Sequence, residues 1–204
     1  RSNLYVNVRK LMDDVVTFDK FKWYVEGFVH DKGLKPDYFL GVPEGMTKLG
    51  LIITYTKSKH DIMFSYESYL SEGYSKVYPL PMARGKIKEH GSEKDKRFLG
   101  GLEGKVVVFE DVLTTGDSAI SLVGSLKKNK AEVLAVIGIV DRLELRDDGL
   151  SVAKKFSKIS IDYFSMTDIK SLIPLACERL KLSEDLLKKI KSYYKKHGSE
   201  EIKL

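Results

Sequence analysis

The chain has 204 residues, 43% of them apolar, which is long enough to bury the core of one globular domain. No run of residues approaches the roughly 18 consecutive apolar positions of a membrane-spanning helix, and the first residues lack the apolar stretch of a signal peptide. We therefore expect a cytoplasmic protein. The chain opens on Arg1 rather than Met, so we also expect that residues precede it.

The formal net charge of +6 raises the question of nucleic acid binding, and the distribution of that charge argues against it. Between residues 179 and 204 there are eight Lys or Arg residues against four Asp or Glu residues, a net +4. Leu182, Leu186, Leu187 and Ile190 repeat at helical spacing in this tail, which predicts a helix with a solvated basic face. The single cysteine, Cys177, lies in an apolar segment and is expected to pack there.

Short apolar runs alternate with segments of helical period along the chain. This alternation predicts an α/β fold with a mainly parallel central sheet flanked by helices. Residues 37–42, 105–109 and 133–140 are the expected strands, and residues 18–29 and 118–128 are expected helices. Another helix is expected to follow residues 43–45 and to run through residue 55. Two further strands are predicted at residues 62–66 and 77–80, around a turn.

Residues 84–104 are highly charged and rich in glycine. They contain almost no apolar anchor, and so long a polar segment inside a domain is typical of a functional lid or a disordered stretch.

The most informative segment is residues 106–118, Val-Val-Val-Phe-Glu-Asp-Val-Leu-Thr-Thr-Gly-Asp-Ser. Hydroxyls and backbone N–H groups at residues 114–118 are suited to surround a phosphate at the start of a helix, and Gly116 allows close approach of the backbone. Glu110 and Asp111 repel phosphate, so they require ribose hydroxyls, a divalent cation or both. A helix N-cap with an acidic turn explains Thr115 or Asp117 alone but not the whole run.

Residues 110–118 resemble the ribosyl-pyrophosphate (PRPP) motif of the type I phosphoribosyltransferases. The resemblance implies that PRPP is held by Glu110, Asp111, Thr114, Thr115, Gly116, Asp117 and Ser118. It also implies that Mg²⁺ is held mainly by PRPP, with Glu110 and Asp111 contributing through water. The motif is shared by enzymes for several bases, so it indicates the donor and leaves the base open.

Residues 84–91, Arg-Gly-Lys-Ile-Lys-Glu-His-Gly, resemble the mobile catalytic loop of the orotate phosphoribosyltransferases. The resemblance implies that Lys88, His90 and Arg84 act in catalysis together with Asp111, and that Lys86, Lys88 and His90 contact PRPP. It further implies a homodimer in which the loop reaches the neighbouring subunit. Gly85 departs from the family pattern, which has a basic residue there. The alternative for this segment is a solvated charged loop.

Three shorter segments are similar to other parts of the same family. Residues 2–9 resemble an early strand whose aromatic residue, here Tyr5, lies near the base, although a core position explains Tyr5 equally well. Residues 40–46 resemble the pyrophosphate loop, in which Glu44 is unexpected beside an anion. Arg142 stands where the family presents an arginine to the orotate carboxylate, with Thr114 also at the base; the alternative is an ion pair with Glu144 or Asp141.

The resemblance covers residues 1–168, where residues 163–168 match the closing strand. We expect a type I phosphoribosyltransferase domain at 1–168 with a small hood and a mobile loop at about 84–104, followed by a helical basic extension at 169–204. The implied reaction transfers ribose 5-phosphate from PRPP to orotate. Two alternatives remain: a phosphoribosyltransferase for a purine or uracil, and a non-catalytic regulator that senses PRPP and binds nucleic acid.

Overall fold

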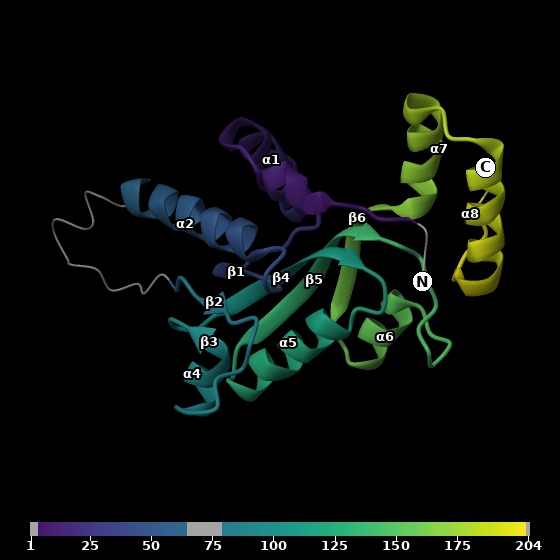
Figure 1. The fold of residues 1–204 in the computed structure, drawn as a ribbon. Helices are drawn as coiled ribbons and strands as arrows, with labels where there is room; N and C mark the ends of the chain where they lie inside the picture. The colour runs from purple at the N-terminus through teal and green to yellow at the C-terminus, as the bar shows by residue number, and fades with distance from the viewer. Residues whose placement is uncertain (1–3, 65–78, 203–204) are drawn as a thin grey trace, which may run out of the picture.

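The computed structural model describes residues 4–64 and 79–202 and is built on a four-stranded sheet (Figure 1). Within this sheet the strands lie in the order β1-β4-β5-β6, and each neighbouring pair is parallel. The strands are β1 (Tyr38–Gly41), β4 (Lys105–Leu113), β5 (Glu132–Asp141) and β6 (Asp162–Asp168). The predicted α/β fold with a parallel central sheet is therefore confirmed.

Helices cover both faces of the sheet because its central strands are apolar on both sides. On β4, Val106 and Val108 enter one core, while Val107 and Phe109 enter the other. The first core is closed by α5 (Asp117–Lys128) and α6 (Val152–Lys158), and the second by a 3-10 helix, η1 (Val8–Met12), with α1 (Val15–Asp31) and α2 (Thr47–Phe64). Figure 1 shows these two sets of helices on opposite sides of the sheet.

Helix α2 extends beyond the helix predicted to end at residue 55. No proline interrupts the segment, and Lys57 pairs with Asp61 one turn further on, at 3.2 Å, which supports the helix. The strand predicted at residues 62–66 is therefore wrong for residues 62–64, and its last two residues lie outside the described part of the chain. Of the strand predicted at residues 77–80, the first two residues also lie outside it, and Pro79 and Leu80 are not in a strand.

The polar segment at residues 84–104 is anchored at both ends. Strand β2 (Met82–Ala83) pairs antiparallel with β3 (Phe98–Leu99), and α4 (Glu93–Arg97) lies between them. Phe98 and Leu102 are buried in the first core, and the hydroxyl of Tyr38 donates a hydrogen bond of 2.9 Å to the carbonyl of Leu102. The expectation that this segment lacks apolar anchors is thus wrong for its C-terminal end, where two apolar side chains are enough to fix the chain.

Helices α7 (Ile169–Leu180) and α8 (Glu184–His197) form a third, smaller core beyond β6. Leu4 and Val6 pack against it, so that both ends of the described chain meet there (Figure 1). Cys177 packs at its edge, as expected. In the described part of the chain, none of the helices combines the length and apolar character needed to cross a membrane.

The segment after α8 pairs with the segment after β5. The amide of Leu145 donates to the carbonyl of His197 at 2.8 Å, and the amide of Ser199 donates to the carbonyl of Leu143 at 2.7 Å. This short antiparallel contact ties the C-terminal tail to the turn that follows Arg142.

Candidate active site

The predicted site residues lie at the carboxyl ends of the parallel strands, where ligands bind in open α/β sheets. The chain leaves β1 at Gly41, β4 at Leu113 and β5 at Asp141. Leu113 and Asp141 are partners in the sheet, so the segments that follow β4 and β5 begin side by side.

The acidic pair Glu110 and Asp111 lies within β4, which continues to Leu113 rather than ending at the carboxylates. Nε of Arg9 lies 2.9 Å from Oδ2 of Asp111. Burial, reinforced by the Asp111 carboxylate, raises the pKa of Glu110 to about 8. Near neutral pH Glu110 therefore carries little charge, while Arg9 contacts the neighbouring carboxyl group.

The loop from Thr114 to Ser118 leads directly into α5. Gly116 has a φ of +70°, and a Cβ there would lie 3.3 Å from Val152 and 3.5 Å from Phe156, so both the backbone and α6 favour glycine. Among the described residues, no side chain caps α5 at Gly116. The N–H groups of its first turn are consequently suited to an anion.

Arg146 lies against this loop and was missed by the sequence reasoning. Its Nη1 donates to the carbonyl of Thr115, and its Nη2 donates to Oδ1 of Asp117 at 2.7 Å. The hydrogen bond from Arg146 lowers the pKa of Asp117 below its usual value. One feature of the sequence could have predicted such a residue. Asp117 lies inside the predicted phosphate loop, where a carboxylate would repel the phosphate unless a cation lies nearby.

A cavity of about 190 Å³ opens beside the loop and gathers the residues expected at the base. Tyr5 from the N-terminal segment, Thr114 after β4 and Arg142 after β5 all line it. The remaining lining residues are Val6, Asn7, Arg9, Asp111 and Val112. Segments more than a hundred residues apart are thus brought to one pocket, next to the acidic pair.

Arg142 both lines this pocket and forms an ion pair. Its Nη2 lies 2.5 Å from Oε1 of Glu144, and each side chain is only 13% exposed. The turn is fixed by Asp141, whose carboxylate accepts hydrogen bonds from the amide of Leu143 at 2.7 Å and the hydroxyl of Tyr163 at 2.8 Å. The ion pair considered as an alternative is therefore present with Glu144, and it coexists with a position in the pocket wall.

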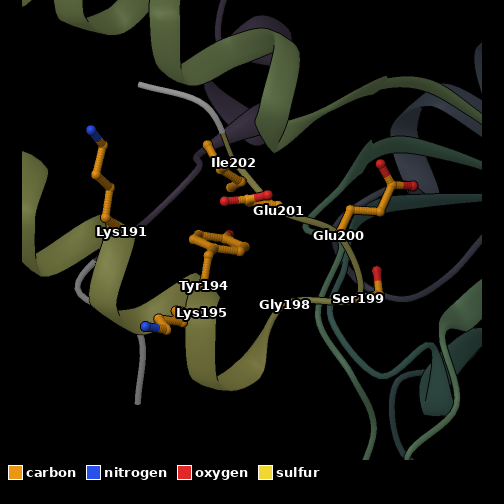
Figure 2. Close-up of a pocket in the computed structure, with 8 residues that line it drawn as sticks. All are labelled: Lys191, Tyr194, Lys195, Gly198, Ser199, Glu200, Glu201 and Ile202. Atoms are coloured by element: carbon orange, nitrogen blue, oxygen red, sulfur yellow. The ribbon is translucent and has the colours of Figure 1, made fainter.

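Tyr194 connects the C-terminal helix to this arginine. Its buried hydroxyl is close enough to Arg142 and Glu144 for both charges to act on its pKa, although burial dominates and raises that pKa to about 12. Figure 2 shows Tyr194 beside a cavity of about 730 Å³ between α8 and the tail. None of the predicted site residues lines this second cavity, so the first one is the candidate active site.

The loop residues are brought to the edge of the site rather than into it. Arg84 is turned into the loop, where its Nε donates to the carbonyl of Asp95 at 3.1 Å. Lys86, Lys88 and His90 are exposed, and among the described residues no hydrogen bond or ion pair joins them to the acidic pair.

The loop meets the rest of the site at Gly85. A Cβ on Gly85 would lie 3.0 Å from Oε1 of Glu44, and a Cβ on Gly45 would lie 2.6 Å from Oδ2 of Asp111. The exposed Glu44 therefore points toward the loop, while the next residue packs on the acidic pair. Gly85, which departs from the family pattern, and Glu44, which is unexpected beside an anion, are thus neighbours in space.

Comparison with known proteins gives the following relatives. The chain is 32% identical over 121 residues to the orotate phosphoribosyltransferase of Staphylococcus haemolyticus, covering 59% of this chain and 56% of that protein. It is 34% identical over 118 residues to the orotate phosphoribosyltransferase of Bacillus subtilis, covering 56% of this chain and 51% of that protein. The matched part thus spans about half the length of these curated relatives. No family model matches the chain.

Among solved structures, the orotate phosphoribosyltransferase of Francisella tularensis superposes with a TM-score of 0.61 at 22% identity, covering 94% of this chain and 85% of that one. The chain therefore shares the fold of that protein. The UMP synthase of Leishmania donovani superposes with a TM-score of 0.69 at 15% identity, covering 94% of this chain and 36% of that one. The resemblance to the orotate phosphoribosyltransferases is confirmed by the curated relatives.

Proposed function

We propose that the chain is an orotate phosphoribosyltransferase, which transfers ribose 5-phosphate from PRPP to orotate and releases pyrophosphate. The observation that carries the proposal is the cavity beside the phosphate loop, where Tyr5, Thr114 and Arg142 meet next to Asp111. We assign residues 1–168 to the catalytic domain and residues 169–204 to a helical basic extension. The sequence similarity to named enzymes supports this reading.

The donor is held at two points in this proposal. The backbone N–H groups and hydroxyls of Thr114, Thr115, Gly116, Asp117 and Ser118 anchor its 5-phosphate at the start of α5. Glu110 and Asp111 hold the ribose hydroxyls. Displacement of pyrophosphate builds positive charge on the sugar ring, as in glycoside chemistry, and we assign the stabilisation of that ring to the carboxylate of Asp111.

Negative charge grows on the departing pyrophosphate, and the loop cations are the groups that balance it. We assign this role to Lys86, Lys88, His90 and Arg84, in the site of the same subunit or of the second subunit of a homodimer. The loop is anchored by β2 and β3 at its base, while the side chains of Lys86, Lys88 and His90 are exposed and that of Arg84 is partly buried. This arrangement suits a segment that closes on the donor and excludes water from the reacting carbon.

Magnesium fits the acidic pair only in part. Within residues 4–64 and 79–202, His, Cys, Asp and Glu side chains do not gather in a group of three or more suited to a metal. Glu110 and Asp111 are oxygen donors of the kind Mg²⁺ prefers, and we propose that they reach it through water while the donor's phosphates supply most of its ligands. Bound there, the ion would neutralise charge on the leaving group.

In this proposal, Arg142 determines which base the enzyme accepts. A guanidinium pairs bidentately with a carboxylate, and orotate is the pyrimidine base that carries one. Glu144 already occupies one edge of Arg142, which favours a neutral base such as uracil as the second candidate. The basic face of the C-terminal tail supports a third candidate, a regulator that binds PRPP without turnover.

The experiment is the ultraviolet loss of orotate on adding protein, PRPP and Mg²⁺, with uracil, hypoxanthine and adenine tested in parallel. Orotate consumption with stoichiometric pyrophosphate release supports the proposal. Turnover with uracil alone supports the second candidate. PRPP binding without turnover of any base, together with salt-dependent RNA or DNA binding, supports the regulator.

A further inference from the structure

Arg146 is the one strong cationic contact that the phosphate loop receives from outside its own segment in the described part of the chain. It comes from the irregular segment after β5, 31 residues away from the carbonyl that it contacts. Its side chain is 11% exposed, whereas that of Asp117 is 65% exposed. The arginine is therefore fixed beneath the loop, and the carboxylate reaches it from the solvent side.

Asp117 makes this loop a poor anion site on its own. It is the first residue of α5, where the helix dipole and the free N–H groups attract an anion, but its carboxylate repels one. Arg146 lies 2.7 Å from that carboxylate and keeps it ionised and paired. Arg146 also lies 3.5 Å from Asp148, so its pairing with Asp117 offsets part of the repulsion that a phosphate dianion would meet there.

The second contact of Arg146 orients the backbone. In a planar trans peptide unit the C=O and the following N–H point in opposite directions. Because Arg146 holds the carbonyl of Thr115, the N–H of Gly116 is directed to the opposite face of the loop. Gly116 has the left-handed φ that starts α5, so this peptide plane is otherwise free to turn.

We propose that Arg146 is a positioning residue for the 5-phosphate half of the donor site. It acts through Asp117, by neutralising its charge, and through Thr115, by fixing the direction of the Gly116 N–H. This inference rests on the proposed function, because it presumes that residues 114–118 receive the 5-phosphate. It adds Arg146, a residue outside the motif, to the donor site. It predicts that substitution of Arg146 weakens binding of the 5-phosphate end of the donor but not binding of its pyrophosphate end.

The test uses ribose 5-phosphate and Mg²⁺-pyrophosphate as separate probes, each titrated calorimetrically into the full chain. Arg146→Ala is expected to weaken ribose 5-phosphate binding by about tenfold, the loss of one charge-assisted contact, and to change pyrophosphate binding by less than about twofold. Arg146→Lys is expected to recover part of the lost affinity, since lysine restores the positive charge but not the two N–H donors that the guanidinium presents to Thr115 and Asp117. Lys127→Ala, at the far end of α5, is the matched control and is expected to bind both probes as the parent does.

The double variant Arg146→Ala/Asp117→Asn separates charge pairing from a merely structural role. If the repulsion argument holds, Asp117→Asn restores ribose 5-phosphate affinity in the Arg146→Ala background to within about threefold of the parent. Equal binding of ribose 5-phosphate by the parent and Arg146→Ala overturns the inference, as does a double variant no better than the single one. A parent chain that binds neither probe instead overturns the proposed function.

Discussion

Nη2 of Arg142 lies 2.5 Å from Oε1 of Glu144, so the arginine that faces the base pocket already has an anionic partner. In the proposed complex with orotate, the carboxylate of the base must share that guanidinium. Glu144 thus sets how much of the positive charge of Arg142 is available to the base.

We expect Glu144→Gln to lower the KM for orotate by about threefold to tenfold, because the base carboxylate becomes the main partner of Arg142. Steady-state kinetics with orotate at saturating PRPP measures the change. Arg142→Gln removes the guanidinium itself, so it should have the opposite effect. It should raise the KM for orotate by at least about tenfold, with the KM for PRPP little changed. A higher orotate KM in Glu144→Gln would instead show that Glu144 serves to hold Arg142 in place.

Lys88→Ala should reduce kcat by about a hundredfold while the Kd for PRPP changes by less than about threefold, because leaving-group charge appears only in the transition state. Single-turnover kinetics and calorimetry measure the two quantities separately. Lys94→Ala, in α4 of the same loop segment, is the control and should leave both values near those of the parent. Equal losses in kcat and in affinity would contradict the assignment of Lys88 to the leaving group.

Gly85→Lys should be tolerated and should raise kcat/KM for PRPP by about threefold, because it restores a cation near the pyrophosphate loop. The three atoms nearest to the added Cβ all belong to the exposed side chain of Glu44, the first of them at 3.0 Å, and that side chain can move. We expect the Tm to stay within about 2 °C of the parent value. Gly85→Ala adds the Cβ without the charge, so a gain seen equally in both variants would rule out the electrostatic explanation.

The raised pKa of Glu110 has a consequence for stability. The folded protein keeps the Glu110 proton up to about pH 8, whereas the unfolded chain loses it near its ordinary pKa of 4.5. Between these values the folded state binds more protons, so the free energy of unfolding falls as the pH rises. Relative to Glu110→Gln, the parent should lose about 2–3 kcal/mol between about pH 5.5 and about pH 7.5.

Urea denaturation of the two proteins at both pH values measures this difference. Parallel pH dependence of the parent and Glu110→Gln would show that the pKa of Glu110 is not raised. A solvent-exposed carboxylate, Glu132 on β5, provides a control through Glu132→Gln, for which we expect no change in the pH dependence.

The central part of the fold was predictable because its signals are local. The buried runs of β4 and β5 and the helical period of α5 lie in continuous segments, and the motif at residues 110–118 joins two of these elements. Their carboxyl ends then had to meet at one edge of the sheet. The predicted base residues Tyr5, Thr114 and Arg142 do line one cavity there.

What the sequence left open depends on contacts between distant segments. Arg146 contacts a loop 31 residues earlier, and the carbonyl of Leu143 accepts a hydrogen bond from Ser199, 56 residues later. No local period or motif reports such contacts, because they depend on how irregular segments fold back over the sheet. The anchoring of the charged loop was missed for the related reason that two buried side chains, Phe98 and Leu102, are too few to form a pattern.

The third core makes the two ends of the described chain a single cooperative unit with the base pocket. Val6 packs against both the second and third cores, and the tail after α8 is hydrogen-bonded to the turn that carries Arg142. Fraying of α8 would therefore also release Tyr194 and the segment around Glu144. We therefore expect local opening at the C-terminal helices to be coupled to loss of order around Arg142, so that hydrogen exchange in the two regions changes together even though they are far apart in the sequence.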